Sequence, residues 1–215
     1  MKKTIVFITL ILITLSSLFA IYLPELEETD RISTYYRLGA SFGLINEGIY
    51  SLPVRSDANG TASLYSGLSL SSDFYKNDTK TNVGFSFSFD VSYPILSNRY
   101  TSGIKESIKN NNLSLSLSFG PIFRFVPSYY FDVSFALRAY LATLDYFKSG
   151  LAFGLSIEPR VDYFLYDYLF VSFSIKASAS ALKIGSDSDF IDENYSSLDA
   201  KAILALGYKI GDKRR

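Results

Sequence analysis

Apolar and polar residues alternate with a period of two over most of the chain after Ser33. The segment VGFSFSFDVSY, residues 83–93, is typical: phenylalanine and valine occupy one side, serine and Asp90 the other. This period predicts strands, because successive side chains of a strand point to opposite faces. Eight such segments are expected, at residues 34–44, 63–74, 83–93, 113–125, 130–141, 151–163, 169–183 and 198–210. Each is long enough for a tilted strand to cross the hydrocarbon of a membrane, which takes roughly 9 to 11 residues.

The links between these segments alternate in length. Residues 45–62, 94–112 and 184–197 are long and polar, whereas 76–80, 126–128 and 165–168 are short. The link at 145–150 is short although it falls on the long side. Outer-membrane barrels combine an even number of strands with short periplasmic turns and longer external loops. Aromatic residues crowd the short links, where an interfacial girdle is expected, at Tyr35, Tyr36, Phe74, Tyr75, Phe123, Phe125, Tyr129 to Phe131, Tyr163, Phe164, Tyr166 and Tyr168.

The polar face of these strands is made of unusually small side chains. A soluble sheet turns a polar face with lysine, glutamate and threonine toward water. Here that face reads Gly39, Ser41, Gly43, then Gly67, Ser69, Ser71, then Gly84, Ser86, Ser88, then Ser114, Ser116, Ser118 and Gly120. Such residues fit the narrow interior of a closed barrel of about eight strands. We therefore predict an all-β fold, an eight-stranded antiparallel up-and-down transmembrane β-barrel with its phenylalanine and leucine face toward lipid; a secreted soluble all-β protein is the alternative.

Two prolines disturb this pattern. Pro121 and Pro159 lie inside predicted strands, and each lacks the N–H that a ladder uses. We expect a bulge or an early strand end at both positions, near the periplasmic rim.

The first 20 residues have the layout of a secretory signal peptide. Lys2 and Lys3 precede an apolar run, and small residues lead to Ala20. The expected organisation is a signal peptide at 1–20, a periplasmic N-terminal tail at 21–32, the barrel at 33–210 and a short basic tail at 211–215. Export in this form directs the chain to a bacterial outer membrane, with the lipids of that membrane as its surroundings.

Composition narrows the chemistry. Without Lys2 and Lys3, 19 basic side chains face 21 acidic ones and no basic patch stands out, so nucleic acid is not an expected partner. The chain has no His and no Cys, which removes the usual base for a serine nucleophile and the common zinc sites. We expect no enzyme and no cofactor; a lysine base or a carboxylate pair would be needed for catalysis. A weak candidate for a metal site is the acidic cluster Asp187, Asp189, Asp192 and Glu193, which lacks the spacing of a known calcium loop.

Charged residues interrupt the small polar face. Because an unpaired charge in a filled lumen is costly, they are expected to pair across the barrel. Neighbouring strands suggest Arg37 with Asp73 and Arg124 with Asp132, and we expect Asp90 to meet Lys176, with Arg138 as the alternative partner. The full set is Arg37, Asp73, Asp90, Arg124, Asp132, Arg138, Glu158, Arg160, Asp162, Lys176, Lys201 and Lys209.

The pattern over residues 33–210 resembles the small eight-stranded outer-membrane barrels of the OmpA and OmpX type. This resemblance implies insertion by the barrel-assembly machinery, which reads a last strand that ends on an aromatic residue. Here LGYKI, ending at Ile210, keeps the alternation but is followed by GDKRR.

Two functions fit this pattern. The first is a non-enzymatic surface protein with a filled lumen, which serves envelope structure or uses its long loops for adhesion or for binding an extracellular ligand. The alternative is a narrow pore or transporter gated by lumenal ion pairs.

Overall fold

The computed structural model describes residues 32–47, 60–76, 81–101, 104–109, 113–144, 150–184 and 197–211. These residues form β1 (Ile32–Glu47), β2 (Gly60–Lys76), β3 (Thr81–Thr101), β4 (Ile104–Ile108), β5 (Ser114–Phe125), β6 (Phe131–Leu144), β7 (Gly150–Phe164), β8 (Leu169–Ile184) and β9 (Ser197–Ile210). The expected signal peptide, nearly all of the tail after it, the acidic cluster at 187–193 and residues 212–215 lie outside the described residues. No helix in the described part of the chain is long and apolar enough to span a membrane.

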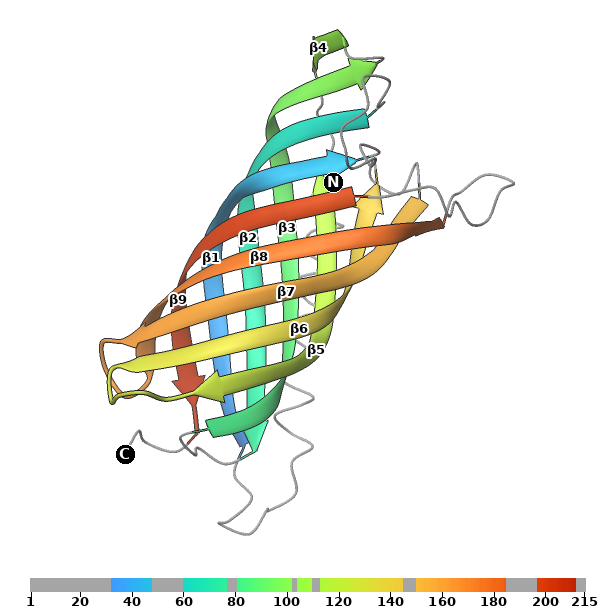
Figure 1. The fold of residues 1–215 in the computed structure, drawn as a ribbon. Coiled ribbons are helices and arrows are strands. Elements are labelled where there is room, and N and C mark those ends of the chain that lie inside the picture. Colours follow the sequence, from blue (N-terminus) through green and yellow to red (C-terminus); the bar gives the residue numbers. More distant parts are fainter. Residues whose placement is uncertain are drawn as a thin grey trace, which may run out of the picture. The chain divides into compact units, whose positions relative to one another are not determined.

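Eight of the nine strands close into a ring (Figure 1). Each strand pairs antiparallel with its neighbour in the order β1, β2, β3, β5, β6, β7, β8 and β9, and β9 pairs back with β1 from Thr34↔Ile210 to Glu47↔Ser197. The predicted eight-stranded up-and-down barrel is confirmed. We call the end that carries the links 77–80, 126–130 and 165–168 the turn end, and the opposite end the loop end.

The prediction of a loop at 94–112 was wrong for residues 94–101 and 104–108, which are strands. β3 continues to Thr101, and β4 pairs with it from Ser97↔Ile108 to Thr101↔Ile104. Register against β2 shifts by one residue between Leu64 and Tyr65, where Ile95 is the extra residue of β3. The expectation rested on polar composition, and the chain continues as a strand because β2 and β4 supply partners on both sides.

The expectation of a bulge or an early strand end at the two prolines was also wrong. Pro121 still pairs with Phe85 of β3, and Pro159 with Phe135 of β6. On the other side of each proline the ladder is interrupted for two residues and resumes in the same register, at Ile122↔Ala136 and at Arg160↔Ser174. A proline removes only its own donor, so a ladder paired on one side tolerates it without an inserted residue.

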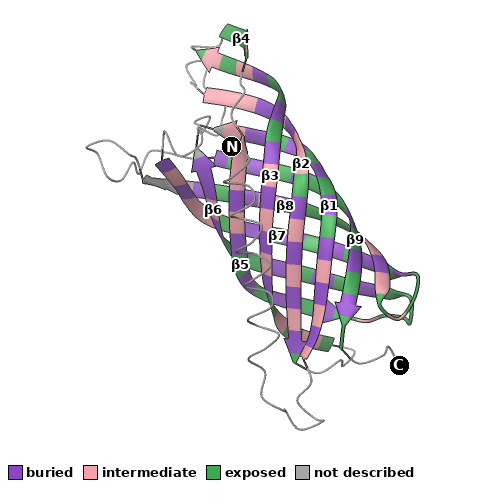
Figure 2. Cartoon of the chain, turned by 180° about the vertical axis from the view of Figure 1, so that it is seen from behind, coloured by how far each residue is buried: buried purple, intermediate pink, exposed green. Residues whose placement is uncertain are grey.

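Burial alternates along the strands as Figure 2 shows, and the buried side is the polar one. In β3 the residues Ser86, Ser88, Asp90 and Ser92 are at most 1% exposed. Large apolar residues face outward instead, among them Leu38, Phe42, Leu68, Phe85, Phe119, Leu155, Phe173, Leu204 and Leu206. This is the reverse of a soluble sheet, and it is the arrangement that a closed barrel has in lipid.

Part of the expected aromatic girdle turns inward. Phe123, Phe125 and the tyrosines of the turns are exposed, whereas Tyr35, Tyr75 and Phe164 are at most 2% exposed. Adjacent aromatic residues of one strand must point to opposite faces, so each pair contributes one ring to the lumen. With Phe170, Ile122 and Ala136, the three inward rings form an apolar cluster at the turn end of the lumen.

Candidate functional site

All twelve charged residues named from the sequence lie in the lumen and are at most 3% exposed. The sequence reasoning missed a thirteenth, Asp199, which is 2% exposed. Asp199 lies two residues before Lys201 on β9, so the same alternation predicts that it faces the lumen. The complete set has seven basic and six acidic members among the described residues.

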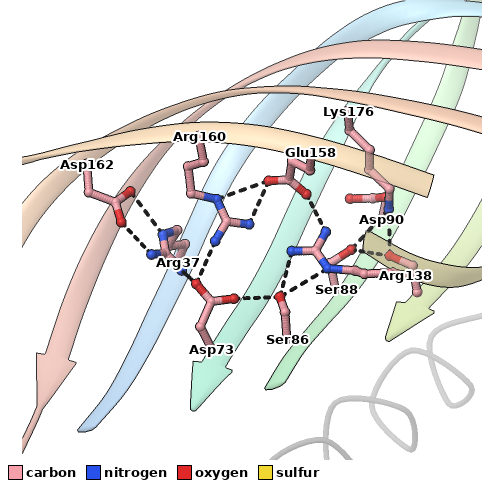
Figure 3. A network of polar contacts seen from close by, with 11 residues as sticks. Arg37, Asp73, Ser86, Ser88, Asp90, Arg138, Glu158, Arg160, Asp162 and Lys176 are labelled. Carbon is pink, nitrogen blue, oxygen red and sulfur yellow. Dashed lines mark hydrogen bonds and ion pairs between the residues drawn. The ribbon is translucent and has the colours of Figure 1, made fainter. Parts of the chain in front are cut away.

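Six of these residues from four strands form one connected network in the half of the lumen toward the turn end (Figure 3). Arg37 of β1 contacts Asp73 of β2 and holds Asp162 of β7 through two bonds, Nη2 to Oδ2 at 2.5 Å and Nε to Oδ1 at 3.2 Å. A guanidinium presents donors in a planar fork, which suits this two-pronged contact with a carboxylate. The expected pairing of Arg37 with Asp73 is therefore present.

The network continues through Arg160 to Arg138. Arg160 donates from Nη1 to Asp73 Oδ2 at 2.6 Å and from Nη2 to Glu158 Oε1 at 2.6 Å. Glu158 also contacts Arg138, whose Nη2 donates to Ser86 Oγ at 2.6 Å. Each carboxylate here accepts from at least one arginine, so burial leaves no member of the network without an opposite charge.

Asp90 forms the second centre. Lys176 Nζ of β8 lies 2.7 Å from Asp90 Oδ2 across the lumen, and both side chains are 0% exposed. The same ammonium is 3.0 Å from Ser88 Oγ and from Ser118 Oγ. The structure thus places together the pair expected from the sequence, while Arg138, the alternative partner, contacts Glu158 instead.

A third pair lies beside the second. Lys201 Nζ is 3.0 Å from Asp199 Oδ2, which also accepts from Tyr140 Oη at 3.3 Å. Lys176 and Lys201 are direct partners in the register of β8 and β9. Like charges directly opposite are unfavourable, and a separate carboxylate beside each ammonium compensates for this.

The turn end of the lumen holds cations against aromatic rings. The guanidinium carbon of Arg124 lies 4.7 Å from the ring centre of Tyr75, and the Lys209 ammonium lies 5.7 Å from that of Tyr35. Arg124 also donates to Tyr35 Oη. By register Arg124 faces Ser134, and Asp132 faces Asp162. The expected Arg124 and Asp132 are therefore diagonal rather than direct neighbours across β5 and β6.

These contacts close the lumen in layers. Asp73, Asp90 and Lys176 are 0% exposed, so none of these three charged side chains is in contact with water. Ion pairs between strands, such as Asp90 of β3 with Lys176 of β8, join opposite walls of the barrel in addition to the ladder. Within the described residues there is no group of three or more His, Cys, Asp or Glu that would suit a metal ion.

Several solved structures are similar to this chain. Neisserial surface protein A matches with a TM-score of 0.51 at 12% identity, over 82% of this chain and 96% of its own. The outer membrane protein OprG from Pseudomonas aeruginosa matches with a TM-score of 0.50 at 12% identity, over 84% and 97%. The outer membrane protease OmpT from Escherichia coli matches with a TM-score of 0.40 at 8% identity, over 86% and 98%. No protein-family model and no curated protein sequence matches the chain.

Identities this low show the fold alone, and a fold hosts many functions. The fold is that of small eight-stranded outer-membrane barrels. With a closed ladder, an apolar outer wall and a charged interior, the chain is an outer-membrane β-barrel protein whose immediate surroundings are lipid.

Proposed function

We propose that this protein is a non-enzymatic, non-conducting outer-membrane barrel that serves envelope structure and presents its loop end for adhesion or binding. The proposal places the turn end in the periplasm, as in other barrels with short turns, and assigns insertion to the barrel-assembly machinery. Its long links at 48–59 and 185–196, outside the described residues, are the proposed contacts with an extracellular ligand.

The observation that carries the closed state is the complete burial of Asp73, Asp90, Arg138 and Lys176, each at most 1% exposed. An open pore of this size would leave lumenal charges in contact with water. Eight strands enclose an interior that side chains just fill, so every ion pair in it also occupies the path an ion would take.

Planar-bilayer recording of the refolded protein tests this proposal. The wild-type protein is expected to give no conductance steps. Co-flotation with vesicles and the circular dichroism of strands establish on the same preparation that the protein is inserted. The absence of conductance steps then indicates a closed lumen. Discrete steps from inserted wild-type protein would contradict the proposal.

The narrow pore is the second candidate, because the lumen contains a chain of charges that can exchange partners. Arg160 already bridges Asp73 and Glu158, and Lys176 and Lys201 lie side by side. If wild-type steps occur and Asp90→Ala or Arg138→Ala abolishes them, the lumen is the pathway and the ion pairs are the gate. Ser178→Ala is the matched control, since this lumenal hydroxyl has no hydrogen-bond partner.

The non-enzymatic part of the proposal is supported by the pairing of the buried carboxylates with cations. A general base has to reach a substrate, and Asp73, Asp90 and Glu158 are occupied by arginine or lysine inside a closed interior. Turnover of a membrane lipid by the refolded protein, lost on Asp90→Asn or Glu158→Gln, would overturn this part.

A further inference from the structure

β4 lies outside the closed ring. It pairs with β3 alone among the described strands and ends the sheet order on that side. In Figure 1 it stands at the loop end, beyond the ends of the other strands. Four of its five residues are exposed, with Ile104 at 72%. Each of the other eight described strands pairs with a neighbour on both sides, so β4 is the strand at which the described sheet is left open.

The register shows which backbone groups of β4 point away from β3, its one partner among the described strands. Thr101 and Ile104 are partners with only two residues between them, which makes them the hydrogen-bonded pair that closes a two-residue hairpin link. Hydrogen-bonded and non-bonded pairs alternate along an antiparallel ladder. Arg99 with Glu106 is then the next bonded pair, and Lys105 and Ser107 direct their N–H and C=O groups away from β3.

The side chains of β4 have a distinct pattern on each face. Ile104, Glu106 and Ile108 share the face of their partners Thr101, Arg99 and Ser97, and the buried Ser97 identifies it as the continuation of the lumenal face. On this face Ile104 and Ile108 thus lie on either side of the Glu106 carboxylate. Arg99 of β3 lies opposite Glu106 in the register. A strand with a basic residue on the other side of Glu106 would place opposite charges across the ladder, which is favourable.

We propose that the free edge of β4 binds an extended peptide segment of a partner protein by strand addition, antiparallel and with a basic residue opposite Glu106. Main-chain hydrogen bonds to Lys105 and Ser107 supply affinity, and the alternating side chains supply specificity. A second copy of this chain fits less well, because in the antiparallel register that overlaps all five residues Glu106 meets Glu106.

The inference rests on the proposed function in one respect, that the loop end, where β4 lies, faces the exterior of the cell. The two fail separately. A silent barrel that binds no peptide removes strand addition alone, and a conducting barrel that binds peptide removes the closed lumen alone.

The test uses a fluorescein-labelled peptide LSNRYT, which repeats residues 96–101 of this chain. This sequence carries the side chains that already face β4 from β3, including the arginine opposite Glu106. Binding to the refolded full-length protein is measured by fluorescence anisotropy in detergent micelles. We expect saturable binding, and at least about tenfold weaker binding when the arginine of the peptide is replaced by glutamate, since a like charge then lies opposite Glu106.

The decisive variant is Lys105→Pro. Proline removes the N–H that faces the free edge and leaves the bonds to β3 in place, so we expect peptide binding to weaken by about tenfold or more. Lys105→Gln makes a similar change of charge but keeps the N–H, and it should stay within about threefold of wild type. Unfolding in urea should be unchanged in both variants, because β4 lies outside the ring.

Three results of the binding assay overturn the inference: no saturable peptide binding, equal binding by Lys105→Pro and wild type, or equal loss in Lys105→Pro and Lys105→Gln. Sedimentation of the protein alone tests the other occupant. Self-association that Lys105→Pro abolishes, together with exclusion of the peptide, would assign the edge to a second copy and overturn the peptide proposal.

Discussion

The pair of Asp90 and Lys176 offers the most direct measurement of what the buried charges contribute. Asp90→Asn keeps the shape of the side chain and its contact with Ser116, but it leaves the Lys176 ammonium without an opposite charge. Removing one partner of a buried ion pair costs about 3 to 5 kcal/mol. Lys176 keeps two serine hydroxyls at 3.0 Å, so we expect the lower end, about 3 kcal/mol.

The double variant Asp90→Asn with Lys176→Met separates the charge from the packing. It removes both charges and fills the space of the lysine stem, and replacing a buried pair by packed apolar groups is often neutral. We expect it to recover most of the loss, which corresponds to a coupling free energy of about 2 kcal/mol between the two sites.

The assay is equilibrium unfolding in urea of protein refolded into phospholipid vesicles, followed by circular dichroism. Ser178→Ala is the control in the same lumen, and it should be neutral or slightly stabilising because its hydroxyl has no hydrogen-bond partner. The reasoning is refuted if Asp90→Asn is as stable as wild type, or if the double variant is no more stable than Asp90→Asn.

Three further changes test the faces and the packing in the same assay. Leu204→Arg on the outer wall, where Leu204 is 60% exposed, should cost about 2 to 4 kcal/mol in lipid; a soluble surface would tolerate it within about 0.5 kcal/mol, so that result would contradict a lipid-facing wall. Gly67→Ala should cost about 1 to 3 kcal/mol, because a Cβ there would collide with the carbonyl oxygen of Val91 and lie 2.7 Å from Ser92 Cα, whereas Ser72→Ala on the same strand should be near neutral. Tyr75→Phe should be neutral or up to about 1 kcal/mol stabilising, because Tyr75 Oη has no hydrogen-bond partner. Tyr35→Phe should cost about 1 to 2 kcal/mol, because Arg124 donates to the Tyr35 hydroxyl. Equal effects of the two variants on stability would contradict these contacts.

The sequence predicted the strands well because their period is local. Residues 83–93 alternate strictly, and β3 contains all of them in the expected orientation. The same alternation, applied residue by residue, places Tyr35 and Tyr75 in the lumen. The expectation that these two residues belong to the girdle was wrong because it treated each adjacent aromatic pair as one feature. The strands at 94–101 and 104–108 were missed because polar composition does not separate a loop from a strand whose partners lie elsewhere in the sequence.

The charged lumen was predictable as a set but not as a network. Period two places Arg37, Asp73 and Asp162 on the inner face of their strands, and burial then demands opposite charges. Which carboxylate each cation meets depends on strand tilt and stagger around the ring, and no local pattern contains these. Asp90 with Lys176 was deducible because both lie near mid-height, but the bridge from Arg37 of β1 to Asp162 of β7 was not.

The sequence by itself determined the positions of eight strands apart from the extension of β3, the inward and outward faces and the absence of histidine and cysteine chemistry, since each of these follows from residue identity and local period. Tertiary structure alone decided the closure of β9 on β1, the partners inside the lumen and the free edge of β4. These depend on which distant segments meet, and a strand pairs by backbone groups that are the same in every residue except proline. Only the closed ring selects among the pairings that the sequence permits.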